Sequence, residues 1–467
     1  DSNGSAPTTG TLSSATGNVG LGKDVFEDIT SGVYNVGIGY EVMKQLTNGS
    51  YHVGIGYKAM SNIGQSGGNG SVAIGKNAML NATSGGAQVA IGLDAMGAGG
   101  TSAGSQNVAI GWEAGKVINN ADYNTFIGTK AGKANTSGSR NIAIGTNAYD
   151  AADTEHDNIA IGYDALGGAV AGGEKNLAIG NYAGDAVTSG DANTLLGYNA
   201  GTTLTTGHSN IAIGAYALEN SDVGTHNIAI GYEALHCAAN SDVDDNVAIG
   251  KASLKAATDG TSGNVAVGIN ALTLATKDDN VAIGFNAANS ITTGERNVFV
   301  GTDAGHALED DSNSVIIGYQ AGDNLTAGSG NVIIGCYTNA PSATADGQLV
   351  IGTSVGINNP TNWIEGDSTG VITFNHKADV VAVSSNTVLT LAQTGSYVYW
   401  TGGTCTLPTS ATVGTQFTVF NNTGGSATVA LGTNNAIVSG WAGNAAVADH
   451  EATSYICVAA TKWIQVG

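Results

Sequence analysis

A short pattern of apolar and small residues recurs along most of the chain. Its fullest form is N-V-A-I-G-x-x-A, as in residues 107–114. The copies align on a glycine that returns every 16 to 19 residues, most often after 17. Repetition on this scale indicates a stack of equivalent structural units rather than several unrelated domains. The twenty aligned glycines are Gly22, Gly39, Gly56, Gly75, Gly92, Gly111, Gly128, Gly145, Gly162, Gly180, Gly197, Gly214, Gly231, Gly250, Gly268, Gly284, Gly301, Gly318, Gly335 and Gly352.

Each unit has the features of one short β-strand followed by a tight turn. Valine and isoleucine two residues apart point to the same face of a strand, and the residue between them points to the opposite face. The glycine that follows suits a sharp corner that needs a positive φ angle or a close backbone contact. No unit is long enough to show the helical period. The sequence therefore predicts an all-β fold, a parallel β-solenoid of about twenty coils of roughly 17 residues.

The strand pattern also leads to a prediction about which face is buried. One inward valine and one inward isoleucine per coil enclose a small core, which is marginal for a single chain. The opposite face is then a long column of glycine and alanine, and such a stripe is typical of an association surface. We therefore expect parallel chains to pack as a cyclic oligomer, with bulky residues such as Met43 and Leu218 filling the seams. The residues expected to pack between chains are Ala73, Ala109, Ala143, Ala178, Ala212, Ala248, Ile316 and Ile333.

Asparagine precedes the strand in fifteen of the twenty units, as at Asn18, Asn141, Asn227 and Asn331. Such a row has two interpretations. One is a row of ligand-binding side chains. The other is an asparagine ladder, in which side-chain amides bond from coil to coil as in other stacked β-structures. The regular repetition favours the ladder.

The period ends near residue 356, and a different composition follows. Almost all of the net charge of −22 lies before residue 370, and only five charged residues come after it. Short alternating strands separated by glycine and asparagine turns then predict a small C-terminal β-sandwich or barrel. The predicted organisation is a lead-in at 1–17, the solenoid at 18–356, a linker at 357–370 and a C-terminal domain at 371–467.

Four of the five tryptophans lie at or beyond this boundary: Trp363, Trp400, Trp441 and Trp463. An exposed tryptophan offers a flat apolar face and an N–H donor, which suits recognition of a sugar ring. Tryptophan also commonly fills the core of a small domain or a subunit interface. We expect Trp441, which is flanked by small residues, to be exposed, and Trp400 and Trp463 are the other candidate receptor-binding residues.

Composition and charge exclude several classes of protein. Collagen is excluded because glycine has no three-residue period and only four prolines occur. The negative charge argues against nucleic acid and anionic membranes as partners, and no apolar run is long enough to span a bilayer. The four cysteines make no disulfide framework; Cys405 and Cys457 either pair with each other or stay free.

No constellation of reactive side chains is evident, so we expect no enzyme activity, no cofactor and no bound metal. Three acidic clusters precede repeat strands: Asp244-Asp245, Asp278-Asp279 and Glu309-Asp310-Asp311. They belong to turns, where carboxylates are solvated, whereas catalytic acids need a cleft. The eight histidines lack the spacing of metal ligands, and no phosphate-binding G-x-x-x-x-G-K-[ST] loop occurs.

The repeated N-V-A-I-G-x-x-A unit resembles the head repeat of trimeric autotransporter adhesins, the YadA-like head. It is also similar to the N-T-A-I-G-Y-x-A-G repeats of bacteriophage tail fibres and tailspikes. The resemblance covers residues 18–356, and it implies a left-handed parallel β-roll whose chains form a homotrimer. The sequence shows no signal peptide, coiled-coil stalk or membrane anchor, and these departures favour a phage fibre over a bacterial adhesin.

The resemblance implies a structural protein of the virion. We expect a tail fibre or spike that joins virion tail proteins and presents its C-terminal domain to a host cell-surface receptor, either a glycan or a protein. The alternative is a bacterial trimeric adhesin or an extracellular filament at the bacterial cell surface. Neither alternative involves nucleic acid or membrane insertion. Ice binding needs a regular row of side chains, and we set it aside because the two residues after each corner glycine vary widely.

Overall fold

The computed structural model describes most of the repeat region and, after it, the strands alone. The described residues are 16–354 without 64–68, 82–85, 99–103, 170 and 239–240, and beyond these the strands between 360 and 466. The chain divides into two compact units, residues 1–373 and 374–467. The described residues contain strands and turns but no helix, in agreement with the predicted all-β class.

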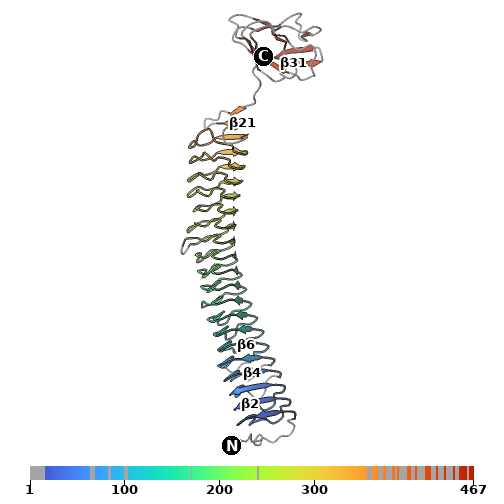
Figure 1. Ribbon diagram of the computed structural model, residues 1–467, viewed down its shortest axis with the longest axis vertical. Coiled ribbons are helices and arrows are strands. Elements are labelled where there is room, and N and C mark those ends of the chain that lie inside the picture. The colour runs from blue at the N-terminus through green and yellow to red at the C-terminus, as the bar shows by residue number, and fades with distance from the viewer. Residues whose placement is uncertain are drawn as a thin grey trace. The chain divides into compact units, whose positions relative to one another are not determined.

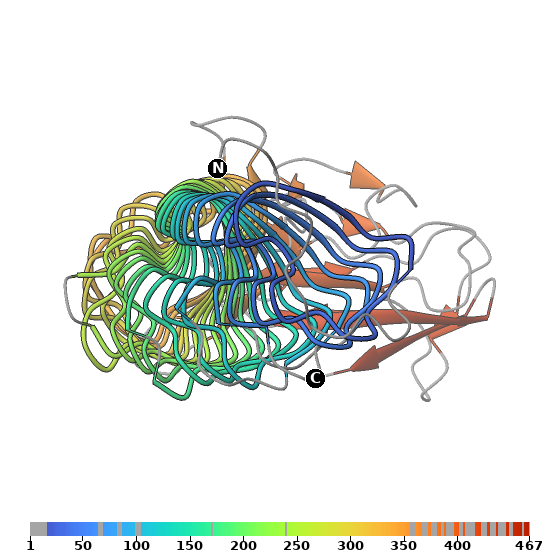
Figure 2. The same cartoon turned by 90° about the horizontal axis from the view of Figure 1, so that it is seen from below.

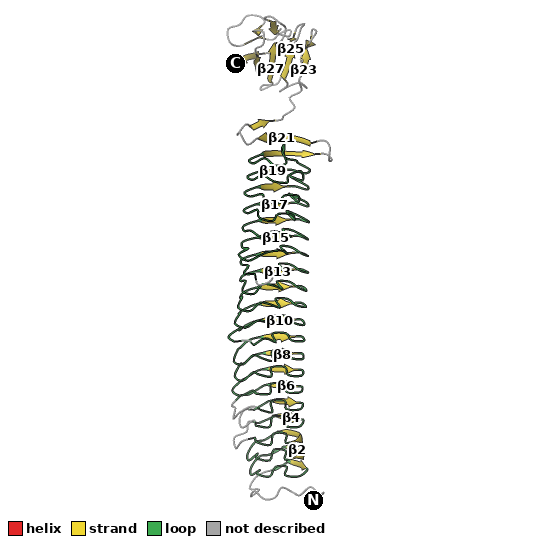
Figure 3. Ribbon diagram, turned by 90° about the vertical axis from the view of Figure 1, so that its left-hand side faces the viewer, coloured by secondary structure: helices red, strands yellow, loops and turns green. Residues whose placement is uncertain are grey.

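The first unit is a stack of short parallel strands (Figures 1 and 3). Each strand from β1 to β19 pairs in parallel with the strand of the next coil; Ala178, for example, is in register with Ala160 on one side and Leu195 on the other. Seen from its end, the stack shows coils that follow one another with small stepwise displacements (Figure 2). Nineteen turns of the chain join these twenty strands, which confirms the predicted parallel β-solenoid.

The strands of this sheet are β1 (Val19–Leu21), β2 (Val36–Tyr40), β3 (Val53–Tyr57), β4 (Val72–Ile74), β5 (Val89–Ile91), β6 (Val108–Ile110), β7 (Thr125–Ile127), β8 (Ile142–Ile144), β9 (Ile159–Ile161), β10 (Leu177–Ile179), β11 (Thr194–Leu196), β12 (Ile211–Ile213), β13 (Ile228–Ile230), β14 (Val247–Ile249), β15 (Val265–Val267), β16 (Val281–Ile283), β17 (Val298–Val300), β18 (Val315–Ile317), β19 (Val332–Ile334), β20 (Leu349–Ser354), β21 (Pro360–Gly366) and β22 (Ile372–Phe374).

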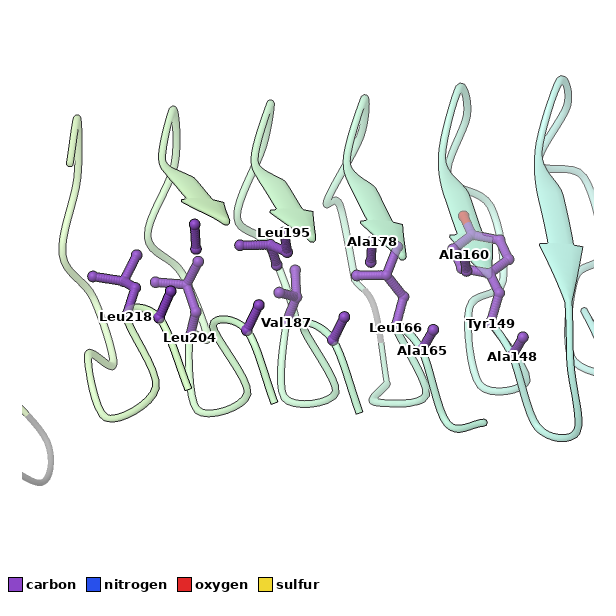
Figure 4. Close-up of a cluster of buried hydrophobic side chains, with 14 of the residues drawn as sticks. Ala148, Tyr149, Ala160, Ala165, Leu166, Ala178, Val187, Leu195, Leu204 and Leu218 are labelled. Carbon is purple, nitrogen blue, oxygen red and sulfur yellow. The ribbon is translucent and has the colours of Figure 1, made fainter. Parts of the chain in front are cut away.

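From β2 on, the strand residue two places before the corner glycine points into the interior of its own chain, so the predicted orientation of the strands is wrong. From β2 to β20 this residue is buried, whereas the apolar or threonine residue on either side of it is partly or fully exposed. Figure 4 shows Ala160, Ala178 and Leu195 directed inward in this way. The residues expected to pack between chains are core residues of a single chain, each of them fully buried: Ala73, Ala109, Ala143, Ala178, Ala212, Ala248, Ile316 and Ile333.

The reason is that each coil is narrow and has room for few large side chains. Met43 and Leu218, which we expected in seams between chains, come from the turn after the corner glycine and fill this interior instead. Where the strand centre is itself large, as at Phe126, the facing turn residue is glycine. A Cβ added at Gly132 would lie 2.5 Å from a ring carbon of Phe126. A small strand centre therefore makes room for a large turn residue, and the reverse also holds.

The corner glycines are required by the close stacking of the coils. From Gly22 to Gly335 their φ angles lie between +132° and +145°, a region that other residues rarely adopt. A Cβ added at Gly197 would lie 2.5 Å from the carbonyl oxygen of Gly214 in the next coil. The repeated glycine is thus explained by both backbone conformation and space.

The parallel stack ends in an antiparallel strand within the predicted linker. β21 lies inside residues 357–370, and it pairs antiparallel with β20, Ile351 being opposite Ile364. An antiparallel strand at this position covers the last edge of the solenoid, which parallel pairing would leave open. Most of the predicted lead-in at 1–17 lies outside the described residues.

The second unit is described by its strand backbones. Six strands form one mixed sheet in the order β23-β25-β27-β31-β32-β29, and two pairs, β24–β26 and β28–β30, form smaller sheets. Whether these sheets close into the predicted sandwich or barrel stays a prediction. The strands are β23 (Val381–Val383), β24 (Thr387–Val388), β25 (Tyr397–Trp400), β26 (Cys405–Thr406), β27 (Gln416–Asn421), β28 (Ala427–Val429), β29 (Ala436–Ile437), β30 (Ala445–Val447), β31 (Ala452–Ala459) and β32 (Lys462–Val466).

Candidate functional site

The outward face of the parallel strands forms an apolar stripe along the solenoid. In β13, for example, Ile228 and Ile230 flank the buried Ala229 and are both partly exposed. Within the stack the exposed fraction is 42% at Ile283 and 40% at Leu196, and it rises to 61% at Leu21 in the first strand. Because nearly every strand carries valine, isoleucine or leucine at these two positions, the stripe continues from coil to coil. A contiguous exposed apolar surface of this kind is typical of an interaction site.

The row of asparagines is a hydrogen-bonded ladder, as predicted. The Oδ1 atom of the buried Asn193 accepts the backbone N–H of Asn210, at 3.0 Å, and its Nδ2 donates to the carbonyl oxygen of Gly207, at 2.9 Å. The same two bonds recur at Asn176 and Asn210. Each buried amide thus satisfies two backbone groups of the following coil. These side chains are engaged in the fold and offer no free row for a ligand.

Near the N-terminal end the ladder is interrupted by a histidine. His52 takes the position of asparagine, and its Nδ1 accepts the backbone N–H of Ser71 at 3.2 Å. Its Nε2 must then carry the proton, and this buried atom has no hydrogen-bond partner among the described residues. Burial lowers the pKa of His52 to about 4. A charged imidazolium is therefore disfavoured in the folded chain.

Near the C-terminal end a serine and an aspartate interrupt the ladder together. The hydroxyl of Ser314 accepts the backbone N–H of Asn331, at 2.8 Å, and donates to Oδ1 of Asp311, at 2.9 Å. Asp311 is fully buried and its Oδ2 has no hydrogen-bond partner among the described residues. Burial raises the pKa of this carboxyl to about 7. The expectation that this acidic cluster is solvated is thus wrong for Asp311.

The other acidic clusters bind backbone groups of neighbouring turns. Asp244 accepts hydrogen bonds from the backbone N–H and the hydroxyl of Thr225, at 2.7 and 2.8 Å, and Asp278 accepts the N–H of Ser262 at 2.9 Å. Nowhere in the described part of the chain do three or more His, Cys, Asp or Glu side chains converge as metal ligands would.

A row of tyrosines follows the corner glycines on five consecutive coils, and sequence reasoning missed it. The rings of neighbouring tyrosines meet edge to face, with centroids 5.4 to 6.1 Å apart. The row is hidden in the sequence because tyrosine alternates between the first and the second position after the glycine. We call these residues the tyrosine ladder: Tyr163, Tyr182, Tyr198, Tyr216 and Tyr232.

The candidate receptor-binding tryptophans belong to the second unit. Trp441 lies outside the described residues. Trp400 ends β25 and Trp463 lies in β32, and the strands β27 and β31 separate them in the sheet, so the backbone does not bring them to adjacent strands. Cys405 and Cys457 lie in strands of different sheets, and their pairing stays a prediction.

Comparisons with known proteins identify no relative of this chain. No protein-family model, curated protein or solved structure matches the chain. Among the described residues, no helix has the length and apolar character needed to cross a membrane. The fold defines the class, an all-β protein built on a long parallel β-solenoid, and the resemblance to YadA-like heads and phage fibres rests on the repeat itself.

Proposed function

We propose that this protein is a structural fibre of a virion, a phage tail fibre or tailspike, and that it acts by presenting surfaces rather than by catalysis. In this role the solenoid is a stiff spacer, and the C-terminal domain meets a host cell-surface receptor, a glycan or a protein. The virion tail proteins hold the fibre on the particle. No cofactor is involved.

The observation that supports this proposal best is the uninterrupted stack of β1 to β20 with an apolar stripe on its outward face. Parallel pairing in one register from coil to coil makes an extended element rather than a globule. The stripe of outward valine and isoleucine is continuous over the same length, so a sister chain in the same orientation can cover it coil by coil. We propose that three chains associate through this face.

The association surface proposed here replaces the one expected from the sequence. The alanine column is sealed inside each chain, so it plays no part between chains. Outward side chains such as Ile179 and Ile230 take that role, because each is partly exposed in the single chain. Burying the valine, isoleucine and leucine side chains at the flanking positions of nearly every strand gives the large apolar contact that a permanent oligomer needs.

The first test is the mass of the full-length chain in solution by light scattering. A trimer predicts about three times the chain mass of 46.3 kDa. A value of one chain mass at micromolar concentration would contradict association through the apolar stripe.

The second test locates the protein on a particle. Antibodies against the purified chain, visualised by electron microscopy on phage lysates of its source, should label thin rods projecting from phage tails. Labelling of bacterial cell surfaces without particles would instead support the alternative of a trimeric adhesin or an extracellular filament, and would overturn the virion assignment.

A further inference from the structure

The tyrosine ladder combines aromatic and polar groups in an alternating order. Tyr163, Tyr198 and Tyr232 are the first residues after their corner glycines, whereas Tyr182 and Tyr216 are the second. In four of the five coils the other of these two positions carries a carboxylate or an amide. Those polar residues are Asp164, Asn181, Asn199 and Glu233, and the exception is Ala215. The ladder is thus a strip of one ring per coil with a polar side chain beside most rings; Asn181 also accepts the backbone N–H of Tyr163, and Glu233 pairs with Lys255, whereas the amide oxygen of Asn199 is buried.

Three of the five rings are exposed and the other two, Tyr182 and Tyr216, are partly exposed, and all are held in place before any partner binds. Tyr163, Tyr198 and Tyr232 are 42%, 45% and 46% exposed. The charge of Asp164 and a hydrogen bond to it raise the pKa of the Tyr163 hydroxyl, and Glu233 does the same for Tyr232. Edge-to-face contacts with the neighbouring tyrosines restrict each ring further. A surface ordered in this way loses little conformational entropy on binding.

From this arrangement we infer that the tyrosine ladder binds a linear, neutral polysaccharide that lies along the axis of the solenoid. The apolar C–H face of a sugar stacks on an aromatic ring, and carboxylate and amide oxygens accept hydrogen bonds from sugar hydroxyls. The spacing of neighbouring ring centroids, 5.4 to 6.1 Å, is close to the length of one sugar in an extended chain, and because neighbouring rings are nearly perpendicular, alternate rings offer their faces to alternate sugars. The carboxylates of the strip and the chain's net charge of −22 disfavour an anionic polymer.

This inference rests on the proposed role in glycan attachment and adds a second binding surface, on the shaft. A C-terminal domain binds at one place, whereas a ladder engages several successive sugars and gains affinity from their number. The sister chain is the competing occupant, because Tyr198 lies two residues after Leu196 of the apolar stripe.

The experiment is affinity electrophoresis of the full chain in gels that contain hydroxyethyl cellulose, galactomannan or dextran, with polygalacturonate as the anionic polymer. The test variant is Tyr163→Ala/Tyr198→Ala/Tyr232→Ala. The matched control is Tyr34→Ala/Tyr51→Ala, which removes an exposed stacked pair, 5.5 Å apart, elsewhere on the solenoid. Circular dichroism and light scattering test whether each variant keeps the fold and the oligomeric mass of the parent.

We expect at least one neutral polymer to retard the parent and the control, and the triple variant to bind it at least about tenfold more weakly, since aromatic anchors carry much of such binding energy. Three results would overturn the inference. The parent is not retarded by any neutral polymer, or the triple variant is retarded as strongly as the parent, or the triple variant changes its oligomeric mass. The second result would mean that the polymer binds elsewhere, such as at the C-terminal domain proposed to bind a glycan. The fibre proposal itself is tested separately, by light scattering and by antibody labelling of phage particles.

Discussion

The regular middle of the asparagine ladder and its interruptions near the two ends differ in how they satisfy the same backbone groups. Around Asn193 each coil uses an uncharged amide that is both a donor and an acceptor, so every bond is independent of pH. His52 replaces a ladder asparagine with a buried titratable side chain, and beside the ladder serine Ser314 the buried carboxyl of Asp311 accepts that serine's hydroxyl. The repeat therefore tolerates a different residue, but the exchange makes local stability depend on pH.

The two interruptions respond to pH in opposite directions. The pKa of Asp311 is raised in the folded chain, so the stability it contributes is present at low pH and is lost as pH rises. The pKa of His52 is lowered, so stability is present at high pH and is lost as pH falls. The comparison predicts that coils near β18 and coils near β3 loosen at opposite ends of the pH range, while those near β11 do not respond.

The largest expected effect is at Asp311. Between its ordinary pKa of 3.8 and its folded value of about 7, the folded chain holds a proton that the unfolded chain releases. Raising the pH through this range should cost about 4 kcal/mol of the local free energy of unfolding. Hydrogen exchange of amides near β18 should therefore accelerate from pH 4 to pH 8 beyond the intrinsic rate change.

The substitution Asp311→Asn removes this titration and should abolish the extra acceleration. Asp310→Asn is the matched control, because Asp310 is exposed and accepts a hydrogen bond from the hydroxyl of Thr293. An unchanged pH response in Asp311→Asn would show that Asp311 is not the titrating group.

A smaller effect is expected at His52. As pH falls from the ordinary pKa of 6.5 to the folded value of about 4, the imidazole of His52 binds a proton in the unfolded chain but stays neutral in the folded chain. The local free energy of unfolding near β3 should fall by about 3 kcal/mol over this range. His52→Asn restores the regular amide and should remove the loss, as measured by amide exchange at pH 4 and 7. The exposed His208 supplies the control His208→Asn; if both variants behave alike, the burial of His52 is not the cause.

The smallest effect concerns the regular part of the ladder. Asn193→Ala leaves the buried N–H of Asn210 without its acceptor and should lower the free energy of unfolding by about 2 kcal/mol at every pH. Asn193→Ser, which copies the arrangement at Ser314, keeps a hydroxyl acceptor and should cost only about 1 kcal/mol. Denaturant titration at several pH values measures both. Equal losses of unfolding free energy in the two variants would mean that the hydrogen bond accepted by Asn193 Oδ1 does not stabilise the ladder.

The coil period, the corner glycines and the asparagine ladder could all be predicted from the sequence, because each repeats at a fixed spacing and has one physical explanation. Which side chains of each strand point into the core could not be predicted from alternation alone, since either of the two alternating sets of side chains could be the buried one. Pairs of residues within a coil do indicate the buried side. A large strand residue occurs with a glycine in the following turn, as Phe126 does with Gly132 and Leu195 with Gly201, which is expected only if the two residues pack in the same core.

Other features depend on how coils stack. The burial of Asp311 needs the neighbouring turns, because a turn acid is exposed by default and the acceptor role of Ser314 is visible only in the ladder. The tyrosine ladder needs the same information, since its rings come from two positions of the repeat and meet only across coils.

The central claim is that the outward face of the strands, and not the alanine column, joins the chains. Chemical cross-linking tests it most directly, with Ile179→Cys on the outward face and Ala178→Cys at the buried centre of the same strand, β10. Both are made with Cys336→Ser, because Cys336 is an exposed free thiol. The Cys336→Ser parent reports any linkage through the remaining cysteines.

In a trimer joined through the apolar stripe, equivalent residues of sister chains meet. A short bis-maleimide should therefore link Ile179→Cys chains into a species of twice the chain mass on a denaturing gel, while Ala178→Cys gives no more linkage than the parent. Linkage through Ala178→Cys, or none through Ile179→Cys in a sample whose mass is that of a trimer, would contradict the account.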